Sequence, residues 1–332
     1  MVAYLIRRLL LAVGTLLVGS FLSFLLVASA GNPLAELRLR PGATEAQIRA
    51  LEAELGADGP VVTRYWTWLT GFVRGDWGRS IALTQARAEV YPAVMEAVSI
   101  TARLVAGAVV LALLLGVLVG VLQAVAQYSI FDYVATGLAY MMFSIPLFCV
   151  TVVVKTYGIK VNDLLEFVGM GRWITTAGSP NTGFTGTAVD MVYKYTGTLL
   201  LPTVSLVLIS FAGYSRFQRA SMLEVLNSDY VRTAKAKGIS QSRVVVRHAL
   251  RNALIPVFTM FSMDFSGFLG GAIIVETVFG WPGMGNLLVN SVRQYDPHML
   301  MGWLMVTATM VVLCNLAADL LYAVLDPRIR VT

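Results

Sequence analysis

Two aspartates, Asp264 and Asp319, stand inside otherwise apolar runs of the sequence. A carboxylate within a membrane costs a few kcal/mol unless it is paired or hydrated, so it marks either a functional site or a buried contact. For Asp264, a hydrated translocation path and a helix–helix hydrogen bond, for example to Asn315 or Ser262, explain the residue equally well. For Asp319, near the end of its run, we favour the hydrogen bond. A proton relay would require a longer series of such acids.

Two basic residues, Arg103 and Lys155, also fall in apolar runs, each near the predicted outer end of its run. Long basic side chains place their charge at the membrane interface while their stems stay in the apolar layer. We therefore interpret both residues as interfacial anchors.

Motifs for catalysis or nucleotide hydrolysis are missing from the sequence. It contains no G-x-x-x-x-G-K-[ST] phosphate loop, no H-E-x-x-H zinc motif and no G-x-S-x-G nucleophile elbow. Cys149 and Cys314 lie in apolar runs, and His248 and His298 are isolated from them and from each other, so neither a disulfide framework nor a metal cluster is indicated. We expect no catalytic centre, no metal site and no resident cofactor in this chain.

The densest charge lies in residues 216–252, which hold eight basic residues and two acidic ones. The net charge of this segment, +6, equals that of the whole chain. Good helix formers run from Asp229 to Gly238, which predicts a helix and its stop. A second helix with a basic stripe is predicted after that stop, ending before Pro256. Its stripe consists of Arg243, Arg247 and Arg251, spaced four residues apart.

Two roles suit this basic segment. It could rest on anionic lipid headgroups, which attract Lys and Arg. That alternative does not explain why Tyr230, Ala234 and Gly238 fall on one helical face, where small residues allow close contact with another surface.

These residues belong to a chain with the composition of a membrane protein. Of its 332 residues, 57% are hydrophobic and 13% are charged, against about 25% charged residues in soluble domains. This composition excludes a soluble or an intrinsically disordered protein. A bilayer is crossed by about 20 apolar residues, and six such runs predict an all-α integral membrane protein. The runs are approximately residues 9–29, 100–124, 134–157, 196–215, 253–275 and 300–324.

The distribution of Lys and Arg predicts how these spans are oriented. Six spans place both termini and residues 216–252 on one side, and Arg7, Arg8, Arg328 and Arg330 add positive charge there. The positive-inside rule makes that side cytoplasmic. The first run ends in Ala-Ser-Ala, which resembles a signal-peptidase site. It exceeds the usual apolar core of about 7–15 residues, so we expect a retained helix.

The external segment, residues 31–98, contains signals for local structure. Thr44 and Gln47 form a capping box, which predicts a helix through Leu55. Gly75-Asp76-Trp77-Gly78 predicts a tight turn. An interfacial belt or a small external core explains the aromatic residues of this segment better than a substrate cage does. These are Tyr65, Trp66, Trp68, Phe72 and Trp77.

Two later segments are expected outside the spans. Residues 158–195 are rich in Gly, Thr and Asn, which predicts a loop with one short helix at 162–168. Residues 279–285, Phe-Gly-Trp-Pro-Gly-Met-Gly, forbid a continuous helix and form either a simple reversal or a gate.

Glycines in two runs predict close helix packing. Gly116 and Gly120 are four residues apart in the second run, the spacing that lets two helix backbones approach. Gly267, Gly270 and Gly271 give the fifth run a thin face near its aspartate, suited to a tight bundle or a subunit interface.

The basic segment resembles the cytoplasmic EAA-type loop of ABC-importer permeases. Residues 229–238 read DYVRTAKAKG and residues 247–256 read RHALRNALIP, which is similar to the dipeptide/oligopeptide group, first-subunit type. The resemblance extends over nearly the full length. Further matches are residues 4–10 (YLIRRLL), 75–80 (GDWGRS), 270–272 (GGA), 275–285 (VETVFGWPGMG), 315–316 with Asp319 and Tyr322, and 326–330 (DPRIR).

This resemblance implies a type I ABC-importer permease fold in a bacterial cytoplasmic membrane, crossed several times. Residues 1–30 would form the N-terminal tail and first helix, residues 31–98 the external segment, and residues 99–332 the permease core. It further implies a pore shared with a second homologous permease, two ATPase subunits that carry ATP and Mg, and an external binding protein that delivers oligopeptides or dipeptides. Membrane lipids surround such a complex, and nucleic acid has no part in it.

The resemblance also assigns candidate sites. The ATPase-coupling loop would comprise Asp229, Tyr230, Val231, Arg232, Thr233, Ala234, Lys235, Ala236, Lys237, Gly238, Arg247 and Arg251. Candidates for the pore or for helix packing are Asp264, Gly267, Gly271, Asn315 and Asp319. Candidates for an outer gate are Glu276, Phe279, Trp281 and Met284.

The sequence departs from the family pattern in two places. Glu-Ala-Ala itself is absent, and Arg232-Thr233-Ala234 stands at its position, so no carboxylate is available there for the coupling contact. Residues 158–195 match nothing in the family. Alternatives are the same type of complex for nickel, opines or another small solute, an ion-coupled secondary transporter, and a membrane-embedded enzyme. The lack of internal repeats and of a set of central ionisable residues argues against the secondary transporter.

Overall fold

Helices run the length of this chain. The computed structural model describes residues 2–30, 45, 49, 59–81, 88–178 and 186–325, so the helix predicted for residues 44–55 lies outside the described residues. In chain order the elements are α1 (Val2–Ala30), α4 (Val61–Val73), α5 (Val90–Val125), α6 (Ile130–Ser144), α7 (Leu147–Phe167), α8 (Ala188–Leu226), α9 (Asp229–Ala236), α10 (Gln241–Arg243), the π-helix η2 (Val244–Ala249), α11 (Leu250–Ala253), α12 (Ile255–Leu269), α13 (Ile273–Phe279), α14 (Met284–Arg293) and α15 (Pro297–Leu325).

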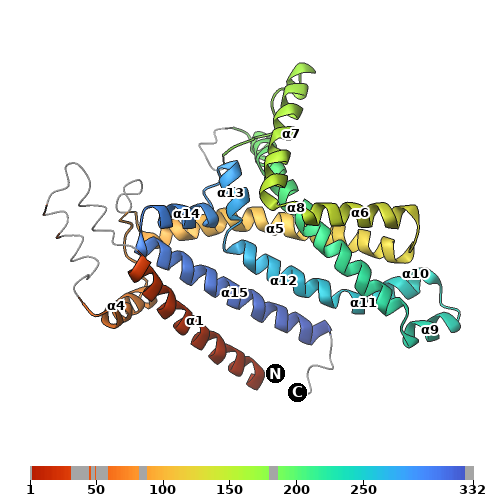
Figure 1. Ribbon diagram of the computed structural model, residues 1–332, viewed down its shortest axis with the longest axis horizontal. Coiled ribbons are helices and arrows are strands. Elements are labelled where there is room, and N and C mark those ends of the chain that lie inside the picture. The colour runs from red at the N-terminus through yellow and green to blue at the C-terminus, as the bar shows by residue number, and fades with distance from the viewer. Residues whose placement is uncertain are drawn as a thin grey trace.

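The six predicted apolar runs all fall on helices, in two different ways. Within the described residues, four helices are long and apolar enough to cross a membrane alone, and two further helix pairs pass the same criterion only together. The single spans are Ile6–Ser29, Val90–Val125, Ala188–Leu226 and Pro297–Ala317. In Figure 1 the long helices lie along the long axis of the molecule, while α7 projects sideways from the bundle.

The third predicted run, residues 134–157, is not one straight helix. The chain bends by 106° between α6 and α7. Ile145 is extended, with φ −85° and ψ 128°, and Pro146 precedes α7. Proline disfavours helical geometry in the residue before it and supplies no N–H, so this pair ends one helix and starts the next. The short helix expected at 162–168 is the end of α7.

The fifth predicted run, residues 253–275, is also interrupted. α12 ends at Leu269, and the chain turns through Gly270 and Gly271 before α13 begins at Ile273. Gly271 has φ +129°, a conformation that side chains rarely adopt, and an added Cβ would lie 2.6 Å from the Cα of Gly285. Gly271 therefore lets the backbone of this turn approach the backbone at Gly285 closely.

The fourth run extends beyond its predicted limits of 196–215 on both sides. Thr187 and Asp190 form a capping box at the start of α8, whose 39 residues continue to Leu226. Two of its buried polar residues bond to their own helix. The hydroxyl groups of Thr198 and Ser205 donate to the carbonyl groups of Lys194 (2.8 Å) and Leu201 (2.9 Å).

The α5–α8 contact forms the centre of the core, and it confirms the packing predicted from two glycines. A Cβ on Gly116 would lie 2.6 Å from the Cβ of Tyr214, and one on Gly120 would lie 2.6 Å from the carbonyl oxygen of Ser215. The absence of side chains at both positions lets α5 and α8 approach closely.

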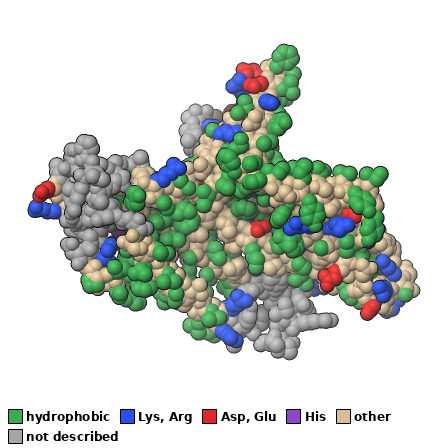
Figure 2. All heavy atoms as spheres, viewed as in Figure 1, with side chains coloured by type: hydrophobic (Ala, Val, Ile, Leu, Met, Phe, Trp, Pro, Cys, Tyr) green, Lys and Arg blue, Asp and Glu red, His purple; other side chains and the backbone are tan. Residues whose placement is uncertain are grey.

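The two ends of the bundle differ in composition. In Figure 1 the start of α1, the end of α15 and the α9–α10 region lie toward one end, and α4 and α14 lie toward the other. Figure 2 shows Lys and Arg side chains gathered over the end of α8 and over α9 and α10, while hydrophobic side chains cover much of α6 and of α7, whose tip carries charges of both signs.

Aromatic residues of α4 pack against the end of α1 in a small core. The Tyr65 side chain is buried, and its ring packs edge-on against Phe21 and Phe24 of α1 at centroid distances of 5.1 and 5.7 Å. Trp77 stacks on Phe72 at 4.4 Å. The turn predicted at residues 75–78 is present, with positive φ at both glycines.

Candidate functional site

The predicted helix–glycine–helix unit is present in the basic segment. α9 spans eight residues and ends just before Gly238, whose φ of +74° requires a left-handed backbone. Val231 and Ala234 are buried against the π-helix, in a small apolar cluster that includes Val244 and Val245. This cluster holds α9 on the rest of the loop and fixes which of its faces is exposed.

The exposed face of α9 differs from the expected one. Ala234 was predicted to offer a small contact surface to a partner, but its side chain is 6% exposed and packs within the chain. Tyr230 is half-exposed, and its hydroxyl accepts a hydrogen bond from Asn252 at 2.8 Å. The exposed residues of α9 and its end are Asp229, Arg232, Thr233, Lys235, Ala236, Lys237 and Gly238.

The second helix of the basic segment is interrupted. α10, the π-helix and α11 follow one another to Ala253, and Pro256 lies in the first turn of α12. Arg247 and Arg251 are exposed, as the predicted stripe requires. A π-helix closes its hydrogen bonds over five residues and is frequent at functional sites, but the apolar sequence VVV gave no signal for it.

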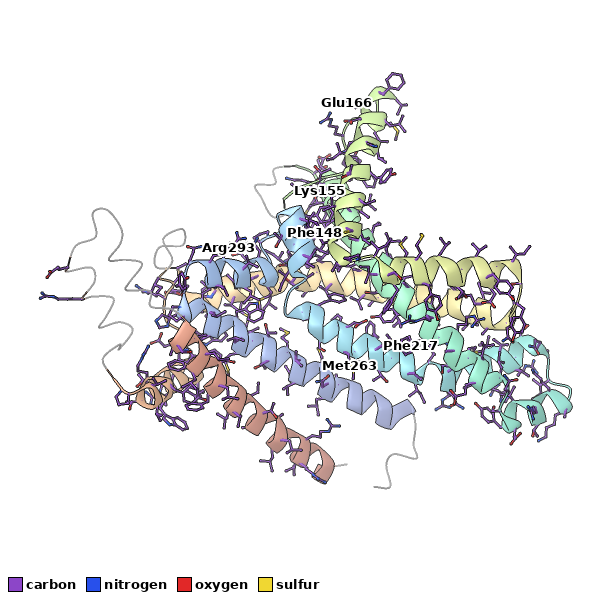
Figure 3. The ribbon with its side chains drawn as sticks, in the orientation of Figure 1. Phe148, Lys155, Glu166, Phe217, Met263 and Arg293 are labelled. Atoms are coloured by element: carbon purple, nitrogen blue, oxygen red, sulfur yellow. The ribbon has the colours of Figure 1, made fainter. Side chains whose placement is uncertain are left out.

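The intramembrane aspartate Asp264 lies on α12, opposite α8. It is half-buried and lies near the hydroxyl group of Tyr214, which is buried and has no hydrogen-bond partner among the described residues. Ser262, one expected partner, donates to its own helix at the Phe258 carbonyl. Beside Asp264, Met263 is 63% exposed and Gly267 faces open space. Figure 3 labels Met263 on this helix.

The other candidates for the pore or for packing lie between α12 and α13 and on α15. Gly271 supports the crossing with Gly285 described above. Asn315 is exposed on α15. Asp319 lies in the last turns of α15, and its side chain is outside the described residues.

The outer-gate candidates form a compact buried unit at the other end of the bundle. Glu276 is fully buried in α13, and its carboxylate accepts hydrogen bonds from the Thr101 hydroxyl (2.6 Å) and from the backbone N–H groups of Gly285 (2.7 Å) and Asn286 (3.1 Å). The Thr101 hydroxyl in turn accepts from the N–H of Met284 at 2.8 Å. One carboxylate thus caps the start of α14 and joins it to α5 and α13.

The remaining gate candidates complete this unit. Phe279, Trp281 and Met284 are each at most 2% exposed. The N–H of Trp281 donates to the Glu276 carbonyl at 2.8 Å, which closes the turn that the glycines and proline predicted. The gate candidates therefore form one tightly packed turn.

Comparison with known proteins decides the family. Residues 1–92 match the N-terminal membrane component of binding-protein-dependent transport systems, and residues 112–331 match the inner membrane component of these systems. The second match alone covers more than half of the chain. The chain belongs to this permease family.

Named relatives align with the permease from end to end. Oligopeptide transport system permease protein OppB of Mycobacterium bovis is 36% identical over 333 residues, with 100% of both chains covered. Oligopeptide transport system permease protein AppB of Bacillus subtilis is 36% identical over 99% of this chain and 100% of its own. Dipeptide transport system permease protein DppB of Escherichia coli is 34% identical over 99% of each chain.

A solved structure shows a weaker likeness to the permease. One chain of an amino acid ABC transporter aligns with a TM-score of 0.46 and 15% identity, over 69% of this chain and 94% of that chain. The family match and the helical spans establish a multi-pass permease subunit of the importer type. Permeases of this family are not enzymes, and ATP hydrolysis belongs to separate subunits.

An ion pair that sequence reasoning missed ties the basic segment of the permease to α6. The side chain of Asp132 is buried, and Arg219 of α8 donates to its two oxygens at 2.6 and 2.7 Å. The side chain of Thr136 and the backbone N–H of Tyr128 also donate to this carboxylate. The signal was present as Ser129-x-x-Asp132 before an apolar run, the pattern of a helix N-cap.

Lys155, which its position predicted to be an interfacial anchor, bonds within the chain. Its Nζ donates to the carbonyl oxygen of Val278 at 2.5 Å and lies 5.8 Å from the centroid of the Phe279 ring. In Figure 3, Lys155 lies on the part of α7 next to α13, far from Glu166 at the tip of the helix. The cation therefore caps the carboxyl end of α13, where helix carbonyl groups are unsatisfied.

Proposed function

We propose that this permease is one of two membrane subunits of an ATP-driven importer that moves oligopeptides or dipeptides across the bacterial cytoplasmic membrane. One observation carries the proposal: the full-length similarity to the named oligopeptide and dipeptide permeases. A second, homologous permease shares the pore, two ATPase subunits bind ATP and Mg, and an external binding protein delivers the peptide. Both termini lie in the cytoplasm, on the side of the basic segment.

We assign the exposed face of α9 as the surface that contacts the ATPase subunit and couples transport to ATP hydrolysis. This face carries charged side chains and the small residue Ala236 and projects from the end of the bundle. Its opposite face is held by the apolar cluster around Val231 and Ala234. Force applied to α9 therefore reaches the π-helix and α8 through packed side chains, as rigid-body coupling requires.

The coupling proposal is tested with two tryptophan substitutions in the reconstituted complex. Ala236→Trp obstructs the exposed face and should lower ATP-driven uptake about tenfold or more, the effect of losing ~1.4 kcal/mol of binding, with little change in thermal stability. Ala234→Trp overfills the buried cluster and should destabilise the chain itself. Glu224→Trp, exposed on the last turn of α8, is the matched control. Normal uptake by Ala236→Trp would refute the assignment.

The pore side of the permease is proposed to include the face of α12 that bears Asp264, Met263 and Gly267. This face has a half-buried carboxylate, an exposed methionine and an open glycine, so the chain itself does not fill it. Met263→Cys in sealed vesicles should react with a membrane-impermeant maleimide when the complex turns over. Val153→Cys on the projecting arm α7, which we assign to contact with the second permease, should be protected in the complex.

The substrate class is tested by uptake into vesicles that contain the whole complex. In vesicles whose interior corresponds to the cytoplasmic side, ATP inside should drive uptake of labelled dipeptide or oligopeptide. An ion gradient without ATP should not drive uptake. ATP-driven uptake of nickel or an opine, and not of peptides, would support the importer but contradict the peptide substrate. Uptake by the single chain with an ion gradient alone would refute the importer.

A further inference from the structure

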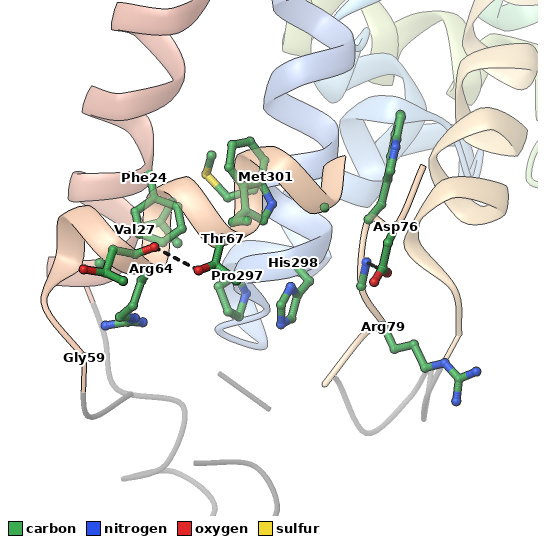
Figure 4. Close-up of a pocket in the computed structure, with 16 residues that line it drawn as sticks. Phe24, Val27, Gly59, Arg64, Thr67, Asp76, Arg79, Pro297, His298 and Met301 are labelled. Atoms are coloured by element: carbon green, nitrogen blue, oxygen red, sulfur yellow. Dashed lines mark hydrogen bonds between the residues drawn. The ribbon is translucent and has the colours of Figure 1, made fainter. Parts of the chain in front are cut away.

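A pocket of about 730 Å³ opens at the external end of the bundle, away from the α12 face. It lies between the last turns of α1, the helix α4, the turn at residues 76–79 and the first turn of α15 (Figure 4). Phe24, Trp68, Trp77 and Met301 form its apolar wall. Its volume is within the range of small-molecule binding sites.

The depth of this pocket places it at the level of lipid headgroups. Phe24 and Val27 in its wall belong to the end of the apolar span Ile6–Ser29, of which only 6% is buried within the chain. The aromatic core around Tyr65 and Trp68 adjoins it, and aromatic residues gather at membrane–water interfaces. The pocket therefore spans the boundary between acyl chains and headgroups.

The charges that line the pocket favour an anion. Of its two arginines, Arg79 pairs with Glu89 at 3.9 Å, and one oxygen of the carboxylate in the lining, Asp76, already accepts the N–H of Gly78 at 3.1 Å, which leaves Arg64 as the cation for an anion. The Nε atom of Arg64 is buried and has no hydrogen-bond partner among the described residues. An unsatisfied buried guanidinium nitrogen is costly, and a phosphate is a strong acceptor for it.

We propose that this pocket binds an anionic phospholipid, with its phosphate on Arg64 and its acyl chains along the exposed surface of α1. A lipid matches both halves of the site, because it carries a phosphate and an apolar tail at this depth. A soluble phosphate would leave the wall formed by Phe24, Trp68 and Met301 unused. Bound lipid would fasten α4 to α1 and α15. The proposal does not depend on the transported substrate.

The proposal is tested by native mass spectrometry of the purified full-length chain titrated with phosphatidylglycerol. Arg64→Gln should weaken retention of one lipid about tenfold, because a charge-assisted hydrogen bond to the phosphate is lost. The matched control is Arg74→Gln, on an exposed arginine just after α4 that does not line the pocket. Thr67→Trp keeps Arg64 and fills the pocket from an exposed position, so it should also expel the lipid.

Three further measurements distinguish an anionic lipid from other ligands of the pocket. Phosphatidylethanolamine should bind more weakly than phosphatidylglycerol, and glycerophosphate without acyl chains should not displace the lipid. Equal retention in wild type, Arg64→Gln and Thr67→Trp would overturn the proposal, as would displacement by glycerophosphate or by a peptide at equal concentration. If Arg64→Gln fails to fold, retention in Thr67→Trp decides the question, because that variant changes neither charge nor Arg64.

Discussion

The hairpin α13–α14 and the basic loop α9–α10 are both short helix–turn–helix units, but they satisfy their polar groups in opposite ways. In the hairpin, Glu276 is fully buried, and three donors within the chain bond its carboxylate. In the loop, the Asp229 side chain is 100% exposed, and its ion pair with Arg232 (70% exposed) spans 3.9 Å. Such an exposed pair contributes little to stability.

This difference separates a fixed part of the permease from an adaptable one. Buried charges with complete hydrogen bonding hold one geometry, since any displacement leaves a charge unsatisfied. Exposed charges keep their hydration and can exchange it for contacts with another protein at little cost. We expect substitutions in the hairpin to reduce folding stability and substitutions on the exposed loop face to reduce transport.

The largest effect is expected for Glu276→Ala. It removes the acceptor for the hydroxyl of Thr101 and for two backbone N–H groups, all in a buried site. Each unsatisfied buried donor costs roughly 1–3 kcal/mol, so we expect a loss of about 4 kcal/mol in the free energy of unfolding. Denaturant titration of the purified chain, followed by near-ultraviolet circular dichroism, measures it.

Two variants control for this prediction. Glu276→Gln retains one acceptor oxygen and should lose about half as much, roughly 2 kcal/mol. Glu89→Ala removes a carboxylate that is mostly exposed and pairs with Arg79 at 3.9 Å, so it should change stability little. If Glu276→Ala were no less stable than Glu89→Ala, the hairpin would not be the fixed part of the molecule.

Much of the fold was readable in the sequence because each apolar run has to satisfy its own backbone within the membrane. Gly116 and Gly120 predicted a close helix crossing because only the absence of side chains permits it. The breaks in the third and fifth runs were missed although Pro146 and Gly270-Gly271 marked them. Each run was interpreted from the length of its apolar stretch, and that length does not show where the helix axis changes direction.

The site was less predictable because burial depends on contacts far apart in sequence. Glu276 was expected near a gate, but its bonds to Thr101 cross 175 positions. Ala234 was expected to face a partner, yet the register of α9 against the π-helix turns it inward. The pair of Asp132 and Arg219 was not predicted because the two residues lie 87 positions apart, and only the α6–α8 packing brings them together.

The second-largest loss of stability is expected for the ion pair between α6 and α8, and it tests whether the fixed part of the molecule extends to the basic loop. Asp132→Asn weakens a buried two-oxygen contact with Arg219, whose side chain is 26% exposed. We expect a loss of about 2–3 kcal/mol, the range for hydrogen bonds to charged groups. Combining it with Arg219→Gln should cost less than the sum of both single changes. Additive losses would show that this ion pair does not link α6 to α8.

A smaller effect is expected at the stop of α9. Gly238 has φ +74° and no atoms within 4 Å of an added Cβ, so Gly238→Ala meets only conformational strain. That strain is about 1 kcal/mol, and Gly238→Asn should cost less, because Asn tolerates the left-handed region. ATP-driven uptake should fall in the order glycine, asparagine, alanine. Equal uptake by all three would show that the backbone conformation at this stop is not needed for coupling.

The smallest effect distinguishes a helix cap from a membrane anchor. Lys155→Met keeps the apolar stem and removes the ammonium group that bonds the Val278 carbonyl at 2.5 Å. We expect a loss of about 0.5–1 kcal/mol, the usual contribution of a cation at a helix carboxyl end.

Lys160→Met on the same helix is the control, because Lys160 is exposed and lies over the Tyr157 ring at 5.4 Å. The cap predicts that only Lys155→Met lowers the unfolding free energy measured in detergent, where no bilayer interface exists. An anchor predicts equal stability of both variants in detergent and a difference only in membranes, which would remove Lys155 from the fixed part of the molecule.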